Sequence, residues 1–182
     1  MPGQQLLETP LPGVKLIRHS VFEDERGIFI KPYNEEELRS VNVDLPVAEY
    51  FITRSAAGVL RGMHYQVGQS AHAKLVTCIS GLILDVVVDI RPESPDFNQP
   101  FSIELAPSSG LSIYIEKGYA HGFYAMEEDS WVSYLTTAGH CPADDKGVLW
   151  SSIDFKWPIE TPRLSKRDQC HPEIGVEKCK FS

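Results

Sequence analysis

One short stretch of the chain places a histidine and a lysine where they could act on the same substrate. His64 lies in the run Arg-Gly-Met-His-Tyr-Gln at 61–66, and Lys74 ends the run His-Ala-Lys at 72–74. Both runs have the character of adjacent strands. At neutral pH an imidazole can take up a proton, and a nearby ammonium can stabilise the negative charge that is left behind. The pair therefore suits chemistry that removes a proton beside a carbonyl.

Other polar side chains interrupt the apolar pattern and suggest a lined cavity. Asp85 and Asp89 share one face of an apolar run, where either pairing with Lys or Arg or the lining of a polar cavity would account for them. Gly118 makes a tight turn before His121, which would aim this imidazole into a barrel. Lysine is seldom buried without a partner, so Lys74 at the start of a buried strand is a less ordinary feature than a lone histidine.

Strand signals dominate the sequence that must position these groups. Short runs rich in β-branched and aromatic residues alternate with Gly, Pro, Ser, Asp and Asn. The expected strands span 75–80, 82–90, 101–105, 111–115 and 131–137. In the run 111–115, leucine and isoleucines alternate with Ser112 and Tyr114, which predicts a half-buried antiparallel strand.

Helical signals are few. One helix is expected at 34–40, with Asn34 as its N-cap and glutamates in its first turn. From Pro142 onward the composition turns to Pro, Lys, Asp and Ser, so we expect loops and a short helix packed over the barrel. Many evenly spaced strands predict an all-β fold, most simply a jelly-roll sandwich or barrel with short peripheral helices. Such barrels hold a small-molecule site inside their mouth.

Length, composition and charge limit the class of protein. A chain of 182 residues with 42% hydrophobic residues can bury a substantial core, and it fits a single domain, 1–182. The formal net charge of -8 argues against a nucleic-acid or anionic-membrane surface, although it permits a local basic pocket for a phosphorylated small molecule. The sequence has neither a long apolar run nor a basic start before one, so neither a membrane span nor a signal peptide is expected.

The cysteines point to a reducing compartment. Cys78, Cys141, Cys170 and Cys179 form no C-x-x-C pair, and without a secretory signal they are expected to be reduced thiols in a cytoplasmic protein. Cys170 stands next to His171, but one such pair is only a weak indication of a metal site.

A set of short motifs runs in a fixed order along the chain. They are Asp-Glu-Arg-Gly-Ile-Phe at 24–29, Val-Leu-Arg-Gly-Met-His-Tyr-Gln at 59–66, Ala-Lys-Leu-Val at 73–76, Asp-Val-Val-Val-Asp-Ile-Arg at 85–91 with Ser94-Pro95, Gly-Tyr-Ala-His-Gly-Phe at 118–123, Tyr134, Trp157-Pro158 and Leu-Ser-Lys-Arg-Asp at 164–168. This set resembles the dTDP-4-dehydrorhamnose 3,5-epimerase family from about Val14 to Asp168. The resemblance implies a cupin-like jelly roll, a homodimer, no metal or other cofactor, and epimerisation of a nucleotide-linked 4-keto-6-deoxy sugar in deoxysugar biosynthesis.

The resemblance also implies a catalytic set, residue by residue. His64 would be the general base that removes the proton next to the C4 ketone. Asp168 would orient this imidazole, fix its tautomer and stabilise the imidazolium. Lys74 would stabilise the enolate oxygen. Tyr134 would return a proton from the opposite face, which inverts the centre.

A binding set for the nucleotide-diphospho-sugar follows in the same way. Arg61, together with Arg26 from the partner subunit, resembles the family's diphosphate ligands, for which a guanidinium fork is suited. His121 would line the sugar or phosphate pocket. The expected binding residues are completed by Phe29, from the same motif as Arg26, and by Glu49, Phe51 and His140.

Several positions depart from the family pattern. Glu49 and Phe51 stand where Gln and Asn usually contact thymine, Lys31 replaces a usual glutamate, and Gly139 and His140 replace a usual tyrosine pair. An ionised carboxylate only accepts hydrogen bonds, so Glu49 suits the amino group of cytosine better than thymine. A C5 epimerase of a CDP-linked 4-keto-3,6-dideoxyhexose is therefore a second hypothesis. Drift at tolerant positions explains the departures equally well, because water can replace a single contact.

Three further functions stand beside these two. A metal-dependent cupin would use His64, His72 and His121 as ligands, but Gln66 occupies the place where a His-x-His motif needs its second histidine. A sugar-binding module without catalysis would lack the base, whereas all the expected catalytic residues are present. A ketoisomerase, which moves the carbonyl from C4 to C3, is not distinguished by residue type.

Overall fold

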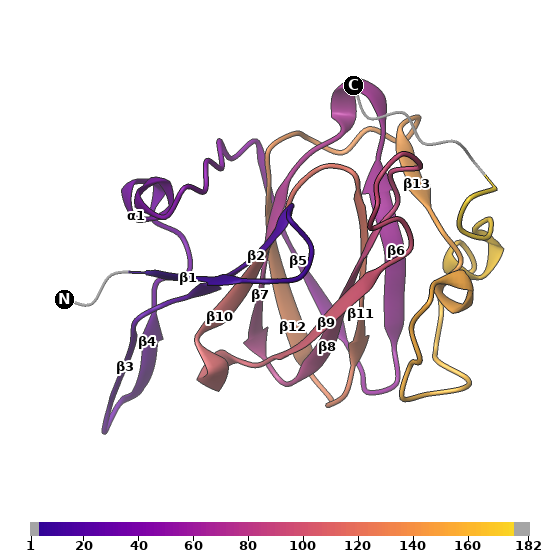
Figure 1. Ribbon diagram of the computed structural model, residues 1–182. Coiled ribbons are helices and arrows are strands. Elements are labelled where there is room, and N and C mark those ends of the chain that lie inside the picture. The colour runs from indigo at the N-terminus through magenta and orange to yellow at the C-terminus, as the bar shows by residue number, and fades with distance from the viewer. Residues whose placement is uncertain (1–3, 177–182) are drawn as a thin grey trace.

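Two antiparallel β-sheets packed face to face make up most of the computed structural model, which describes residues 4–176 (Figure 1). One sheet has the strand order β1-β2-β10-β7-β12-β5, and the other has the order β13-β6-β11-β8-β9. The strands are β1 (Gln5–Glu8), β2 (Val14–Arg18), β3 (Val21–Asp24), β4 (Gly27–Ile30), β5 (Glu49–Ser55), β6 (Leu60–Gln66), β7 (Lys74–Ser80), β8 (Ile83–Asp89), β9 (Pro100–Leu105), β10 (Leu111–Ile115), β11 (Tyr119–Ala125), β12 (Ser130–Thr136) and β13 (Asp145–Gly147). The all-β, cupin-like jelly roll predicted from the sequence is confirmed.

The local predictions hold closely. The strands expected in the middle of the sequence appear as β7 to β10 and β12, each shifted at its ends by no more than one residue. Helix α1 (Glu35–Ser40) begins after Asn34, whose side chain accepts a hydrogen bond of 3.1 Å from the N–H of Glu37. The predicted N-cap is therefore present.

The main core fills the space between the two sheets. Val76, Ile113 and Val132 face it from the first sheet, and Val87 and Phe123 face it from the second, all with at most 1% of their surface exposed. These side chains are among the most deeply buried of the residues that the structure describes.

The prediction that the strand at 111–115 is half buried is wrong. Ser112 is fully buried and Tyr114 is 7% exposed, although both lie on the face opposite the main core. Tyr114 packs with Leu38 of α1 and with Val43 and Leu45 just beyond it, and these cover the outside of the sheet. Strand periodicity could not reveal this cover, because it comes from a distant part of the chain.

The segment after Pro142 covers the outer face of the second sheet, as expected. Trp150 and Trp157 pack there against residues of β6 and β8, and 3-10 helices form at Trp150–Ser152 and Asp168–Cys170. Short 3-10 helices also form at Gly68–Ser70 and Pro107–Ser109. The sequence did not predict β13, which pairs with β6. Cys179 lies outside the described residues.

Strands β3 and β4 form a separate hairpin that projects away from the sandwich (Figure 1). Its apolar side chains are exposed, Phe22 by 44%, Ile28 by 48% and Phe29 by 60%. None of the helices among residues 4–176 has the length and apolar character that crossing a membrane requires.

Candidate active site

A cavity of about 380 Å³ opens between the two sheets. The six-stranded sheet contributes Lys74 and Tyr134, and the five-stranded sheet contributes His64 and His121. The sequence-predicted residues that line this cavity are Glu49, Phe51, Arg61, His64, Lys74, His121, Tyr134, His140 and Asp168. The structure thus brings together all predicted site residues except Arg26 and Phe29.

A bulge in β6 turns two of these residues into the cavity. His64 and Arg61 are three residues apart, so a regular strand would place them on opposite faces. Opposite them β11 advances only from His121 to Phe123, and the extra residue in β6 shifts the register. Gly62 occupies the bulge at φ +131°, and a Cβ there would lie 2.6 Å from the Cα of Gly122. Only glycine suits this backbone and this close approach.

His64 is held from behind by a carboxylate. Its Nε2 lies 2.7 Å from Oδ1 of Asp168, which the 3-10 helix at Asp168–Cys170 carries into the end of the cavity. Burial alone would raise the pKa of Asp168, but hydrogen bonding and charge from His64, with a hydrogen bond from Ser165, hold that pKa below its ordinary value. The same oxygen lies 3.4 Å from Nε2 of His171. An ionised Asp168 thus faces His64.

Lys74 is the buried cation of the site. Only 9% of its surface is exposed, and burial lowers the pKa of its ammonium from 10.5 to about 8, although the charges of Asp85 and Asp145 oppose this shift. At pH 7 Lys74 remains mostly protonated. An ammonium in such surroundings can stabilise a developing oxyanion strongly, because little water screens it.

His121 is the cross-strand neighbour of His64 and has its own carboxylate. Its Nε2 lies 2.8 Å from Oδ2 of Asp85, which is fully buried. Burial lowers the pKa of His121, against the attraction of Asp85. Asp89, on the same strand face, pairs instead with Arg91. Both predicted explanations of the aspartates therefore apply in part, because Asp89 pairs with an arginine and Asp85 supports a cavity-lining histidine.

Tyr134 forms part of the wall that the six-stranded sheet contributes. Burial raises the pKa of its hydroxyl above the ordinary value, so it stays protonated. Its ring stacks on that of Phe51 across the β5–β12 pair, with centroids 4.6 Å apart and an angle of 10° between the planes. Phe51 therefore uses one ring face to position Tyr134.

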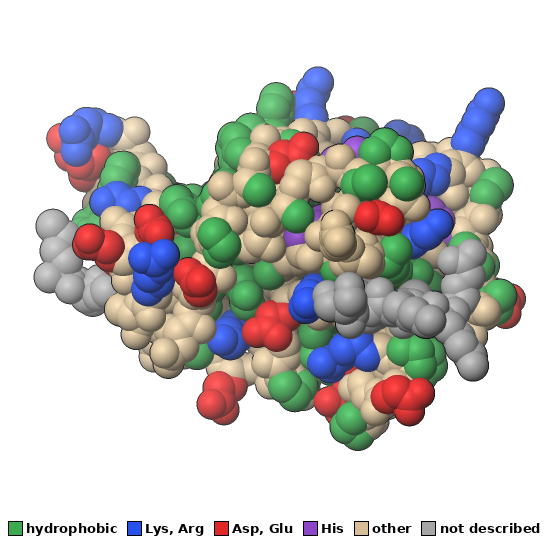
Figure 2. Space-filling model, turned by 90° about the horizontal axis from the view of Figure 1, so that it is seen from above, with side chains coloured by type: hydrophobic (Ala, Val, Ile, Leu, Met, Phe, Trp, Pro, Cys, Tyr) green, Lys and Arg blue, Asp and Glu red, His purple; other side chains and the backbone are tan. Residues whose placement is uncertain are grey.

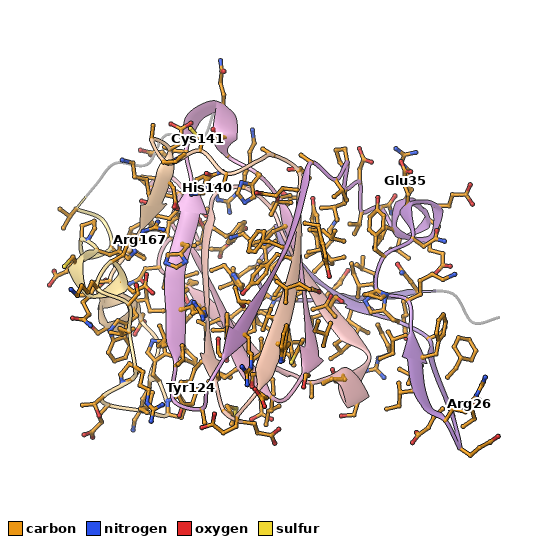
Figure 3. All side chains as sticks on the ribbon, turned by 180° about the vertical axis from the view of Figure 1, so that it is seen from behind. Arg26, Glu35, Tyr124, His140, Cys141 and Arg167 are labelled. Atoms are coloured by element: carbon orange, nitrogen blue, oxygen red, sulfur yellow. The ribbon has the colours of Figure 1, made fainter. Side chains whose placement is uncertain are left out.

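Charged groups surround the mouth of the cavity. Asp145 bonds to both His140, at 2.9 Å, and Arg167, at 2.6 Å, and Oε2 of Glu49 accepts a hydrogen bond of 3.1 Å from the backbone of His140. Figure 3 shows His140 and Arg167 on the same side of the sandwich, away from Arg26. In the view from above, histidine side chains are seen among acidic, basic and hydrophobic ones (Figure 2).

Sequence reasoning missed several cavity residues. Arg167 lies within one of the family motifs, next to Asp168, but the resemblance implies no role for it. Asp145 carried no signal, because only the pairing of β13 with β6 brings it to the cavity. Gln66 and His72 bond to each other at 3.0 Å and line the wall beside Lys74.

Arg26 and Phe29 lie outside the cavity of their own chain. Both belong to the projecting hairpin, and Arg26 at its tip bonds to Asp24 with its side chain 84% exposed. Figure 3 shows Arg26 at the far side of the molecule from His140 and Arg167. Within one chain these two residues cannot take part in the site.

The ligand set of the metal-dependent cupin hypothesis is not assembled. Among residues 4–176, the histidines and acidic groups close enough to share an ion are His64, Asp168 and His171. His72 instead bonds to Gln66, and His121 bonds to Asp85.

Comparison with known proteins places the chain in a family. A sequence model described as dTDP-4-dehydrorhamnose 3,5-epimerase matches residues 8–175. The chain belongs to this family. A dTDP-4-dehydrorhamnose 3,5-epimerase of Salmonella typhimurium is 36% identical over 92% of this chain and 93% of its own length.

Comparison with solved structures supports the same family. A dTDP-4-dehydrorhamnose 3,5-epimerase of Bacillus anthracis with TDP and PPi bound has a TM-score of 0.91 and 32% identity, covering 94% of this chain and 100% of that one. ChmJ, a 3'-monoepimerase from Streptomyces bikiniensis solved with dTDP-quinovose, has a TM-score of 0.86 and 29% identity over 93% of this chain and 88% of its own. The predicted membership of the dTDP-4-dehydrorhamnose 3,5-epimerase family is confirmed, and with it the class of enzyme, a sugar-epimerising isomerase.

Proposed function

We propose that this member of the dTDP-4-dehydrorhamnose 3,5-epimerase family inverts C5, C3 or both of a nucleotide-diphospho-4-keto-6-deoxyhexose. The observation that carries the proposal is the 2.7 Å contact between His64 and Asp168 in a cavity shared with Lys74 and Tyr134. With Nε2–H donated to the carboxylate, Nδ1 keeps its lone pair and can take the proton next to the C4 ketone.

The remaining groups support the rest of the reaction. The ammonium of Lys74 would stabilise the enolate oxygen formed when the proton leaves. Tyr134 stands on the other sheet from His64, so a proton from its hydroxyl would reach the sugar from the opposite face and invert the centre. Arg61, fixed by hydrogen bonds to Ser55 and to the backbone of Arg54, would bind the diphosphate.

Solvent exchange tests these roles. In deuterated water the wild type should incorporate deuterium next to the ketone, followed at C3 and C5 by NMR. His64→Ala should abolish exchange, because it removes the base. Tyr134→Phe should keep exchange with retention and lose inversion, whereas Tyr50→Phe, at an exposed tyrosine of β5, should behave as wild type. Equal loss of exchange in His64→Ala and Tyr134→Phe would mean that the roles are assigned wrongly.

The nucleotide is open to a second proposal, because the carboxylate of Glu49 lines the cavity. A carboxylate suits the amino group of cytosine, and a CDP-linked 4-keto-3,6-dideoxyhexose would need inversion at C5 alone. An unpaired buried acceptor costs about 1–3 kcal/mol, a preference of roughly five- to hundredfold. Glu49→Gln should then shift affinity from CDP toward dTDP in calorimetric titrations, while Glu104→Gln, outside the cavity, should not. A wild type that prefers dTDP would leave the 3,5-epimerase of a dTDP-sugar as the function.

We also propose that the enzyme is a cytoplasmic homodimer. The hairpin carries Arg26 and exposed Phe22, Ile28 and Phe29, and seating it on a second copy would bury these apolar groups and bring Arg26 to the partner's cavity. Light scattering should give twice the mass of the chain. Phe29→Asp should yield monomers with a raised KM, and a monomeric wild type would refute the proposal.

A further inference from the structure

Asp168 is contacted by two imidazoles, and the function proposed above uses only one of them. Its Oδ1 lies 2.7 Å from Nε2 of His64 and 3.4 Å from Nε2 of His171. The second distance is too long for a well-formed hydrogen bond. The side chain of His171 is only 9% exposed, and its Nε2 has no hydrogen-bond partner within the part of the chain that the structure describes. A buried polar atom left in this state needs an explanation.

The fold makes room for this second ring. Gly147 of β13 is the cross-strand neighbour of His64, and a Cβ at this position would lie 2.5 Å from Nε2 of His171. The glycine thus leaves the space into which His171 fits, edge to face with His64 at a centroid distance of 5.6 Å. The three ligand atoms of His64, Asp168 and His171 lie within 4.8 Å of one another.

We propose that these three side chains form a site for a divalent cation of the zinc type, and that the cation inhibits the enzyme. Two imidazole nitrogens and one carboxylate oxygen are a set that zinc takes, with a fourth position left to water. Metal–ligand distances of about 2.0–2.2 Å would require movements on the order of 1 Å, which side-chain rotations can supply. His64 lies at the cavity wall, so the site is within reach of solvent.

The expected inhibition rests on the proposed function, in which the two ring nitrogens of His64 have different roles. The base needs Nε2–H directed at Asp168 and a lone pair on Nδ1. A cation on Nε2 displaces that hydrogen, and the neutral ring must then carry its proton on Nδ1. Proton abstraction stops, although the space for the sugar stays free because the cation sits behind the ring. Zinc should therefore lower kcat and leave KM unchanged.

Cobalt is the probe, because its visible absorption reports binding without reference to activity. The wild type should develop a d–d band on titration with Co²⁺ that Zn²⁺ abolishes. His171→Gln removes a proposed ligand and should therefore weaken Co²⁺ binding. The loss should be at least the roughly 10- to 100-fold that removal of a mere outer-sphere partner costs. Asp168→Asn should weaken it also, and Cys170→Ser, beside His171 but with an exposed thiol, should bind as wild type. Circular dichroism establishes that each variant is folded.

The outcomes separate the two proposals. No cobalt band at about 1 mM metal, equal binding by the wild type and His171→Gln, or loss of binding in Cys170→Ser would each overturn the site. Inhibition that raises KM would also overturn it, because the cation would then occupy the sugar cavity. If the protein failed to epimerise any substrate, the cobalt titration would still decide whether the site exists.

Discussion

Replacement of Lys74 by methionine should make the protein more stable and much less active. Burial lowers the pKa of the ammonium from 10.5 to about 8, so the folded protein holds this charge at a cost. One pKa unit corresponds to about 1.4 kcal/mol, and the whole difference gives about 3 kcal/mol. Lys74→Met removes the charge and keeps an unbranched chain of similar length. At pH 7 the free energy of unfolding should rise by up to this amount.

The pH dependence gives the sharper test. Between pH about 8 and 10.5 the unfolded chain holds a proton that the folded chain has lost, so the wild type gains stability as pH rises through this window. The advantage of Lys74→Met should therefore be full at pH 7 and small near pH 10.5. Urea unfolding followed by tryptophan fluorescence at both pH values, at one fixed protein concentration, measures this difference.

Activity should move in the opposite direction. Loss of one group that stabilises an oxyanion costs about 10²–10³ in kcat. In the wild type, kcat should fall about tenfold per pH unit above pH 8, as the ammonium loses its proton. Lys166→Met, at an exposed lysine, should change stability by no more than about 0.5 kcal/mol and leave the rate unchanged. If Lys74→Met were less stable than wild type at pH 7, the burial argument would be refuted.

Three other predictions concern the same cavity. Turnover should persist in EDTA, because the proposed reaction uses side chains alone; full loss that a divalent ion restores would contradict this. Asp168→Asn should slow solvent exchange by about 10²–10⁴-fold with little change in KM, because an amide that donates to Nε2 of His64 leaves Nδ1 of that ring protonated. An exchange rate within a factor of ten of wild type would show that another group fixes the tautomer of His64. Gly62→Ala should cost at least about 2 kcal/mol in urea unfolding, since its Cβ would lie 2.6 Å from Gly122 at φ +131°. The control Gly139→Ala, with no atom within 4 Å of its Cβ, should be nearly neutral, and equal effects would mean that the bulge is not strained.

Much of the fold could be predicted from local sequence patterns, because the residues that determine these patterns are neighbours in the chain. Runs of β-branched and aromatic residues identified β7 and β12, and the cap at Asn34 needs only Glu37, three residues away. The motifs around His64 and Asp168 were enough to recognise the family resemblance. That resemblance implied the contact between these two residues, although they are 104 positions apart in the chain. The Gly118 turn gave the direction of His121, since a tight turn fixes the strand that follows it.

Other features depend on contacts between distant segments, which no local pattern records. Strand periodicity places Arg61 and His64 on opposite faces, and only the register between β6 and β11 shows that a bulge turns both into one cavity. The cover over Tyr114 comes from α1, and Asp145 reaches the cavity through the pairing of β13. His171 had little significance in the sequence. The sequence determined which chemical groups the protein has, and the packing of distant strands decided which of them share a site, because burial and proximity are set by the whole fold.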